Sequence, residues 1–459
     1  MRARQKKPYV RKCAIGFAIA FAFLGASQAF AQETIRDEEP TPSSVKESHT
    51  AIERLFAPYQ RTEPPPSPMT LKEWLKNADP FFRDAKINVT LRTYDLDSNS
   101  TTDKKAWAGG GWISAQSGYW LNFVSLGGVF YTSQPIWAPS CCDGTLLLEP
   151  GQHGYSVLGQ AYARFKLNEQ TFFTAGRYLY DTPYLGPNDN RMTPNTFEGY
   201  VLQGTLGSKD GPNVKYGAGY ITDIKNRNSD IFIPMSIAAG ATLVDRGVTA
   251  AGALYTDGPF SIGAINYYSN DIINIAYGET KYRFDFGNGA GILFAGQYVD
   301  QRSTGNDLLT GMPFQTDQFA VKTEMGAAGA IFTFAYSLTG NGRNMQNPWS
   351  GNPVYTGAMV QDFNRAGEQG YLVKLSYDLS KVGVKGVTAY ALYAWGSTNV
   401  FTPVKENEWD FDLQWRPDWQ QLKGLSFRAR YGIIDVNSAG VHTGTHQLRL
   451  IAQYDFAVL

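Results

Sequence analysis

The sequence predicts an all-β protein: a transmembrane antiparallel β-barrel of about eighteen strands with inward-folded loops. From about Lys86 to the C-terminus, apolar and polar residues alternate with a period of two, in segments of about ten residues. The chain holds 47 Gly, 27 Tyr, 27 Phe and 10 Trp, a usage typical of barrels. Its mean hydropathy of −0.30 is too polar for a helical membrane protein, whereas in a barrel only every second strand residue meets lipid.

Residues 1–31 are predicted to be a signal peptide. Arg2, Arg4, Lys6, Lys7, Arg11 and Lys12 form a basic region without acidic residues, and an apolar segment extends from Ala14 to Gly25. Ala29-Phe30-Ala31 then offers small residues for cleavage after Ala31. The apolar segment is shorter than the ~20 residues that a spanning helix needs. We therefore expect export, and a location in the outer membrane of a Gram-negative cell.

Residues 32–80 differ in composition from the alternating part of the chain. They are rich in Pro and Glu, with Pro64-Pro65-Pro66 and Pro68, and they show no alternation. This composition predicts a flexible periplasmic extension. The barrel is expected to comprise residues 81–459.

Charge and cysteine content exclude several classes of function. The 41 basic residues, less the six of the leader, leave 35 against 41 acidic ones, which argues against a nucleic-acid partner. After cleavage only Cys141 and Cys142 remain, with no Cys/His metal spacing, so neither a metal nor another cofactor is expected. Whether these adjacent thiols form a strained vicinal disulfide is open.

The alternation assigns the two faces of each strand. In the first strand Ile87, Val89 and Leu91 share the apolar face, and Arg92 lies on the polar face. Near the C-terminus, Trp409 and Phe411 alternate with Asp410 and Asp412 in the same way. Strands of about ten residues are longer than the five to six typical of soluble sandwiches. Apolar side chains are therefore expected to face lipid, and polar ones a water-filled lumen.

Connections between the segments alternate in length. Leu167–Gln170 and Gly287–Gly289 have the composition of tight turns. The long connections are Thr132–Gly154, Asp181–Pro194, Asp223–Thr242, Ser303–Thr316 and Asn341–Gly370. Short periplasmic turns and long extracellular loops are the pattern of an outer-membrane barrel. The strand pattern is weakest between Asn213 and Asp257.

Several segments resemble the OprD-type substrate-specific outer-membrane porins. The matching segments are Phe81–Tyr94, Lys105–Trp107, Asp189–Gly199, Asn347–Trp349, Asp362–Glu368 with Tyr377-Asp378, and Lys423–Arg430. The resemblance implies an eighteen-stranded barrel, often a loose homotrimer in outer-membrane lipid, whose inward-folded loops narrow a pore. It further implies a row of basic residues along one wall.

Residues that match this basic row are Arg92, Lys105, Arg428, Arg430 and Arg449. The alternation independently places Arg92, Arg428, Arg430 and Arg449 on the polar face, and it adds Arg164 and Lys166. Charged side chains at a narrowing select the solutes that pass. Small anionic or zwitterionic solutes, carboxylates or amino acids, are therefore the expected cargo. Alternatively, these arginines only balance lumen carboxylates such as Asp410, Asp412 and Asp455.

Two loops are predicted to narrow the pore. The constriction loop is Tyr180–Asn195, which offers Asp181, Tyr184, Asp189 and Arg191 and is stiffened by prolines. A second inward loop, Asn341–Gly370, carries Trp349 and Tyr355. The chain departs from the family at Leu392, where alignment puts an arginine, and at Leu459, where the family ends in an aromatic residue.

Other functions are compatible with parts of the pattern. A sugar-preferring or general porin is the nearest alternative, and an adhesin or structural barrel also fits the long loops. A barrel acyl hydrolase needs a serine and a histidine, and only His446 near Ser438 offers such a pair. The 459 residues less a 31-residue leader leave no room for a plug domain with a 22-stranded barrel.

Overall fold

The computed structural model describes residues 78–208, 211–287 and 289–459. The predicted signal peptide, and the predicted extension up to residue 77, lie outside the described residues. No helix among the described residues is long and apolar enough to cross a membrane.

Among the described residues, nineteen strands form one sheet, and eighteen of them are long. β8 (Ile233–Pro234) has two residues and pairs with the end of β7. The long strands are β1 (Lys86–Asn99), β2 (Lys104–Gln116), β3 (Val124–Trp137), β4 (Tyr155–Asn168), β5 (Thr171–Tyr178), β6 (Thr196–Gly207), β7 (Asn213–Lys225), β9 (Val248–Asp257), β10 (Phe260–Ser269), β11 (Ile273–Gly287), β12 (Ala290–Arg302), β13 (Gln315–Ala327), β14 (Ala330–Thr339), β15 (Gln369–Asp378), β16 (Val387–Thr398), β17 (Val404–Trp415), β18 (Leu425–Ser438) and β19 (Val441–Ala457).

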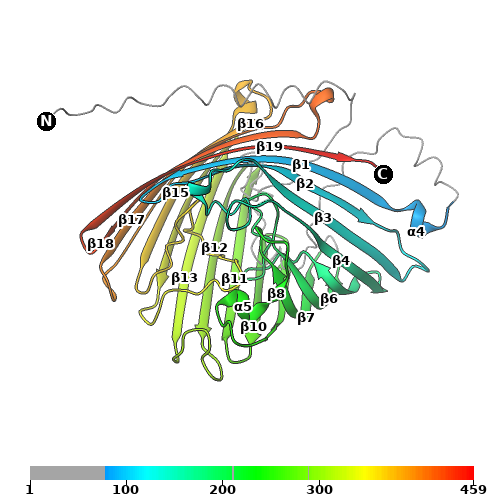
Figure 1. Cartoon of the computed structure of the whole chain (residues 1–459), viewed down its shortest axis with the longest axis horizontal. Helices are drawn as coiled ribbons and strands as arrows, with labels where there is room; N and C mark the ends of the chain where they lie inside the picture. Colours follow the sequence, from blue (N-terminus) through cyan, green and yellow to red (C-terminus); the bar gives the residue numbers. More distant parts are fainter. Residues whose placement is uncertain (1–77, 209–210, 288) are drawn as a thin grey trace.

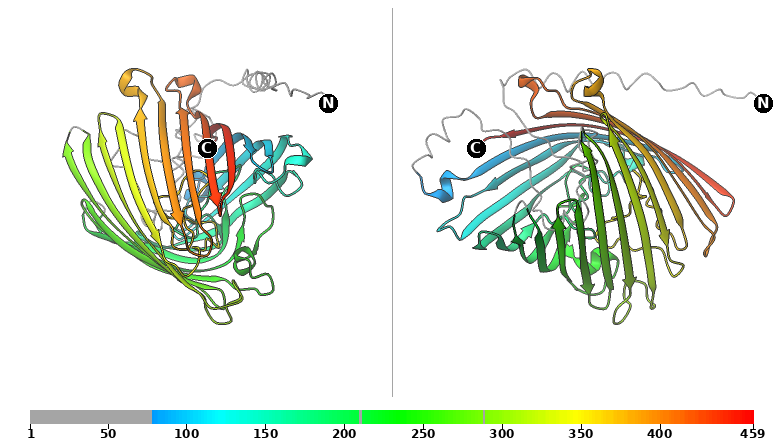
Figure 2. Two further views of the ribbon diagram at one scale, coloured as in Figure 1. Left: turned by 90° about the vertical axis from the view of Figure 1, so that its left-hand side faces the viewer. Right: turned by 180° about the vertical axis from the view of Figure 1, so that it is seen from behind.

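The sheet closes into a barrel. Each long strand is antiparallel to the next, β7 pairs directly with β9, and β1 pairs with β19 from Asn88–Ala457 to Asn99–His446. The strands are strongly tilted and curve around an interior (Figures 1 and 2). Closure is required in lipid because an open edge would leave backbone groups without hydrogen-bond partners. The predicted barrel of about eighteen strands is confirmed.

The two faces of the strands agree with the predicted alternation. Leu91 and Trp409 are 54% and 43% exposed on the outer surface, whereas Arg92 and Asp410 are 7% and 1% exposed on the inner one. Aromatic rings form clusters on the outer surface near both ends of the barrel. Tyr371 and Trp395 stack at 5.2 Å near one end, and Trp415 and Phe427 stack at 5.7 Å near the other. Such girdles mark the two membrane interfaces.

Long loops gather at one end of the barrel and short connections at the other. The long loops are 138–154, 179–195, 226–247, 303–314 and 340–368. The predicted boundaries differ slightly, because β3 continues to Trp137 and β7 to Lys225. Between Asn213 and Asp257, where the sequence pattern is weakest, the chain interrupts its strands with β8 and α5 (Met235–Ala239). The other short helices are α4 (Pro80–Arg83), η3 (Ser140–Cys142), η4 (Leu379–Val382) and η5 (Gln420–Leu422).

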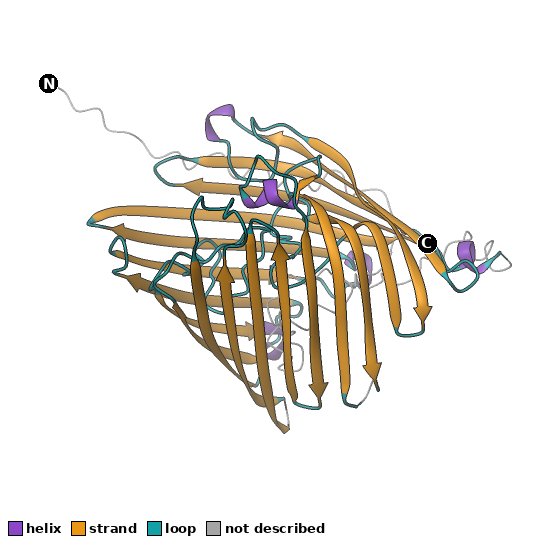
Figure 3. Cartoon of the chain, turned by 90° about the horizontal axis from the view of Figure 1, so that it is seen from below, coloured by secondary structure: helices purple, strands orange, loops and turns teal. Residues whose placement is uncertain are grey.

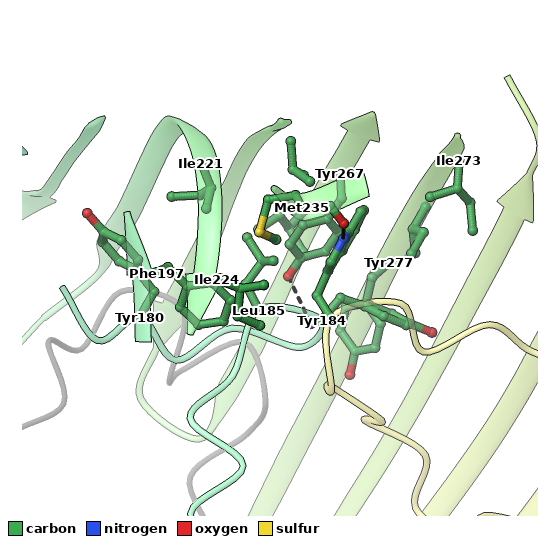
Figure 4. Close-up of a cluster of buried hydrophobic side chains, with 14 of the residues drawn as sticks. Tyr180, Tyr184, Leu185, Phe197, Ile221, Ile224, Met235, Tyr267, Ile273 and Tyr277 are labelled. Carbon is green, nitrogen blue, oxygen red and sulfur yellow. Dashed lines mark hydrogen bonds between the residues drawn. The ribbon is translucent and has the colours of Figure 1, made fainter. Parts of the chain in front are cut away.

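Some of the long loops turn inward and pack against the inner wall. Figure 3 shows loop segments running across the strands and not only beyond their ends. Tyr184 and Leu185 of loop 179–195 lie beside Met235 and Tyr267 in the largest buried apolar cluster (Figure 4). Tyr267 donates a hydrogen bond to Thr182 Oγ1 at 2.9 Å. The apolar core of this barrel therefore lies between inward loops and wall.

Candidate functional site

Loop 179–195 is fixed to β1 by a buried ion pair. Arg92 Nη1 lies 2.6 Å from Asp189 Oδ1, and Nη2 lies 3.2 Å from Oδ2. Arg92 also donates to the Arg191 carbonyl at 2.7 Å, and Tyr94 Oη donates to the Asn190 carbonyl at 3.2 Å. A bidentate guanidinium–carboxylate pair fixes both position and orientation. Segment 189–191 is thereby held against the inner wall.

Loop 340–368 is fixed to β17 with the charges reversed: here the wall supplies the carboxylates and the loop supplies the donors. The backbone N–H groups of Met359, Val360 and Gln361 donate to the carboxylates of Asp410 and Glu408, at 2.9, 2.9 and 2.7 Å. The Arg365 guanidinium pairs with Glu406. Glu406, Glu408, Asp410 and Asp412 occupy successive inward positions of β17, and all are buried. Sequence reasoning missed Glu406 and Glu408, although their spacing of four and two residues from Asp410 was a usable signal.

The two inward loops contact each other. Leu185 and Ser350 form an isolated antiparallel bridge. The next residue is Gly351, where a Cβ atom would lie 2.3 Å from the Pro183 carbonyl oxygen. Trp349 is fully buried, and its Nε1 donates to the Met235 carbonyl at 3.0 Å. The loops therefore form one partition inside the barrel, and their anchors on β1 and β17 are separated along the wall by β18 and β19.

The remaining predicted loop residues differ in their roles. Tyr184 is buried and accepts a hydrogen bond from Gln301 Nε2 at 3.2 Å. Asp181 is half-buried on the same loop. Tyr355 reaches the wall formed by β11 and β13, where its hydroxyl donates to Glu279 and its ring faces Lys322 Nζ at 5.1 Å.

Arginines of β1, β18 and β19 form a continuous inner surface, which we call the arginine wall. It comprises Arg92, Arg428, Arg430 and Arg449. Arg428 Nε and Arg430 Nε share Asp412 Oδ2, at 2.8 and 2.9 Å. Arg449 lies directly across from Arg430 and donates to the Met359 carbonyl at 3.0 Å. Like charges placed opposite one another repel, so these side chains depend on such acceptors.

A small cavity lies between the arginine wall and loop 179–195. Its lining residues are Arg92, Tyr94, Asp189, Asn190, Arg191, Gln414, Ser426, Arg428, Arg430, Ile451 and Gln453. Four of these residues are arginines and one is a carboxylate. The cavity therefore presents a polar, positively charged lining beside loop 179–195.

Two cations of the loops are held by neutral oxygens. Arg191 Nε donates to the Thr145 carbonyl at 2.8 Å, and Arg227 Nη1 donates to Asn188 Oδ1 at 3.0 Å and to Asn190. Burial lowers the pKa of Arg191 to about 9 and that of Arg227 to about 10. Both remain cationic at neutral pH and add positive charge near the cavity. Arg227 was missed because its neighbours, unlike those of the strands, have no alternating pattern.

One predicted member of the basic row is wrong. Lys105 pairs in register with Asp97, on the outer face that carries Trp107, and its Nζ lies 3.3 Å from Asp97 Oδ2. The inner face of β2 carries Ala106 and Ala108, which pack under Leu147 and Met192. Lys105 therefore does not line the lumen.

Arg164 and Lys166 face inward but lie away from the constriction. Arg164 rests over the Phe172 ring at 4.3 Å, and Lys166 Nζ lies 2.7 Å from Glu169 in the tight turn after β4. These two cations stand at the short-turn end, whereas the cavity residues stand near the inward loops. They are not brought together with the arginine wall.

Leu392 also faces inward, as the alternation predicts. It is 5% exposed and packs with Phe363, Tyr390 and Leu372. Tyr390 in turn accepts a hydrogen bond from Arg430 Nη2 at 2.9 Å. An apolar contact with loop 340–368 thus takes the place of a cation at this position.

The serine and histidine considered for a barrel acyl hydrolase are not brought together. His446 lies on the outer face, with Nδ1 3.0 Å from the Tyr431 hydroxyl. Its cross-strand partner is Ile433, five residues from Ser438, about 17 Å along the strand. Cys141 and Cys142 are free thiols. Within the described ranges, no group of three or more His, Cys, Asp or Glu side chains is placed to hold a metal ion.

Comparison with known proteins identifies the family. The family model described as "outer membrane porin, OprD family" matches residues 138–458. This chain belongs to the OprD family. It is therefore an outer-membrane porin, and its barrel forms a transport channel. A comparison with curated proteins finds no match.

Solved structures of OprD-family porins share the fold. OccK9 (OpdG) of Pseudomonas aeruginosa is 22% identical, with a TM-score of 0.74 over 83% of this chain and 100% of that one. OccAB1 of Acinetobacter baumannii is 17% identical, with a TM-score of 0.73 over 83% of this chain and 99% of that one. OpdK of Pseudomonas aeruginosa, solved with vanillate, is 20% identical, with a TM-score of 0.71 over 82% of this chain and 100% of that one.

Proposed function

We propose that this OprD-family porin passes small carboxylates or amino acids by passive, selective diffusion, without an enzymatic step. The observation that carries the proposal is the cavity beside the constriction, where four arginines face one carboxylate. A solute carboxylate forms charge-assisted hydrogen bonds with such guanidinium groups. Conduction further requires that no single site hold the solute too firmly.

The partners of the arginines support weak, stepwise binding. Arg428 and Arg430 share one carboxylate oxygen, and Arg92 is engaged by Asp189 and by Gln453 Oε1 at 2.8 Å. A solute anion therefore competes with existing acceptors at each arginine. This competition offsets the strong attraction that several neighbouring cations would otherwise exert.

Two further observations favour carboxylates over sugars. The neighbouring aromatic rings of β15, β16 and β17 face outward, so they lie on the lipid side and not along the solute path. Vanillate, present in the structure of the related OpdK, is itself a carboxylate. A sugar-preferring or general porin remains the alternative outcome of a substrate panel.

The remaining expectations complete the proposal. The leader is proposed to be cleaved after Ala31, and the mature barrel to reside in outer-membrane lipid as a loose homotrimer. Mass analysis of the purified mature chain tests the cleavage site, and cross-linking in membranes tests the trimer.

Single-channel recording with a panel of carboxylates, amino acids and sugars tests the transport proposal. We expect Arg428→Ala with Arg430→Ala to lower both anion selectivity and carboxylate-dependent current interruptions. Lys105→Ala, on the outer face, serves as the control and should behave as the wild type. Unchanged conductance and selectivity in the double variant would remove the arginine wall from the transport route.

A further inference from the structure

A second set of charged side chains lines the inner surface of β11, β13 and β15. We call it the lysine wall, and it comprises Lys281, Lys322 and Lys374 together with Glu279 and Glu324. Lys281, Glu279 and Glu324 are about 95% buried, and Lys322 Nζ lies 2.8 Å from Glu324 Oε1. Arg283, the next inward residue of β11, adds a fourth cation. Like the arginine wall, this region carries more basic than acidic groups.

Small side chains lie directly across from some of these long ones. Lys322 lies directly across from Ala295 on one side and Ala335 on the other. Ala320, two residues before Lys322, lies across from Gln297. Lys281 is two strands from Lys322, about 10 Å by the usual spacing of strands. Alanines therefore separate the long basic side chains across these strands.

Two neutral polar side chains beside the lysine wall have no hydrogen-bond partner. Gln297 is 2% exposed and both its amide atoms are unpartnered, and Thr333 is 3% exposed with an unpartnered Oγ1. Both lie on the inner face, Gln297 across from Glu279 and Thr333 across from Glu324 and Lys374. Buried polar groups are normally paired, and an unpaired one costs about 1–3 kcal/mol. Their position beside the lysines indicates a polar ligand.

Tyr355 and Tyr390 connect the lysine wall to loop 340–368 and to the arginine wall. Tyr355 of loop 340–368 is bonded to Glu279 and faces Lys322. The Tyr390 ring faces Lys374 Nζ at 5.2 Å, while its hydroxyl accepts from Arg430. The lysine wall is thus continuous with the arginine wall through one aromatic side chain.

We propose that the lysine wall is a second solute-binding subsite of the pore, selective for carboxylates that also carry hydroxyl groups. Lysine ammonium groups bind the carboxylate, and Gln297 and Thr333 bind the hydroxyls. The assignment rests on the proposed function, since it names a further binding step on the same route. A solute without hydroxyl groups, such as acetate, uses only the ammonium groups there.

The test compares gluconate with acetate in single-channel recordings of the purified full-length protein. Wild type should show brief current interruptions with gluconate and fewer with acetate. Lys322→Gln combined with Glu324→Gln removes the ammonium while keeping the net charge of the lumen. Loss of one hydrogen bond to a charged group should shorten the gluconate residence time about tenfold. Gln297→Leu with Thr333→Val should shorten it as well, and should leave acetate unchanged.

Lys105→Gln is the matched control, because this lysine lies on the outer face and is also paired with a carboxylate. Thermal unfolding in detergent verifies that each variant is folded. The subsite proposal is overturned if the gluconate residence time is unchanged in both lysine-wall variants. It is also overturned if gluconate causes no current interruptions in wild type. If only Arg428→Ala with Arg430→Ala abolishes the interruptions, the subsite is wrong and the proposed function stands. If wild type does not conduct, both are wrong.

Discussion

The two inward loops reach the same partition by opposite chemistry. Loop 179–195 supplies the acid, Asp189, and the wall supplies the base, Arg92. Loop 340–368 supplies backbone N–H groups, and the wall supplies the acids Glu408 and Asp410. In the first anchor most contacts come from a single wall side chain, Arg92, whereas in the second they are shared among Glu406, Glu408 and Asp410. Single substitutions should therefore loosen the first loop more than the second.

The largest effect is expected for Arg92→Ala. It leaves Asp189, whose side chain is 9% exposed, as an unpaired buried charge, a loss of about 3–5 kcal/mol in the free energy of unfolding. Loop 179–195 should detach, raising single-channel conductance and lowering the unfolding temperature. Arg83→Ala is the control, since its ion pair with Asp84 is exposed. A conductance equal to that of wild type would show that Asp189 does not need Arg92.

A smaller effect is expected for Glu408→Ala with Asp410→Ala. Three N–H bonds to carboxylates are lost, but the cost of burying two charges is relieved as well, so the net loss is about 2 kcal/mol. Conductance should rise less than in Arg92→Ala. Asp435→Ala, an exposed carboxylate of β18, is the control. A larger rise than in Arg92→Ala would reverse the ranking of the two anchors.

Gly351→Ala tests the contact between the loops without touching either anchor. Its Cβ would lie 2.3 Å from the Pro183 oxygen and 2.5 Å from Tyr184 Cα, so the backbones must separate. Such overpacking typically costs about 1–3 kcal/mol, and loop movement should place it at the lower end. More frequent conductance fluctuations are expected. Gly444→Ala is the control, because its added Cβ meets nothing within 4 Å, and its conductance should equal that of wild type. If Gly351→Ala also leaves the conductance unchanged, the two loops act independently.

The smallest effect concerns pH and acts only on loop 340–368. Burial, together with the nearby Glu406 carboxylate, raises the pKa of Glu368 from 4.5 to about 8. Because this pKa is raised in the folded state, protonated Glu368 stabilises the folded protein. That stabilisation is complete below about pH 4.5 and is lost as pH rises through about 8. The effect is modest because Glu368 accepts the Arg365 N–H bond, 2.9 Å long, in either state.

Current noise should therefore increase between about pH 6 and pH 9 in wild type, and this increase should vanish in Glu368→Gln. Noise that rises equally in Glu368→Gln would assign the pH response to another group. The pH response should be the same in Arg92→Ala as in wild type, because that substitution affects loop 179–195.

Much of the site was predictable because alternation is a local property. Arg92, Arg428, Arg430 and Arg449 were placed inward by counting residues along single strands, and Asp189 was placed on the correct loop. The error at Lys105 has a visible cause. It came from matching a family segment, whereas Trp107, two residues on, shares its outer face.

Other features could not be predicted because they depend on residues far apart in the chain. Arg92 meets Asp189 across 97 positions, and Met359 meets Asp410 through a backbone N–H group that no side-chain pattern reveals. The lysine wall was missed for a related reason. Lys281, Lys322 and Lys374 lie on three separate strands, so no single strand shows them together.

The sequence by itself determined the fold class, the approximate number of strands and the side of the sheet on which most residues lie. These properties result from the two-residue repeat of an extended backbone, which acts within a single strand. Only the tertiary structure decided which loop reaches which wall and which charges meet inside the lumen. Closure of the barrel sets those distances, and no local pattern of residues encodes them.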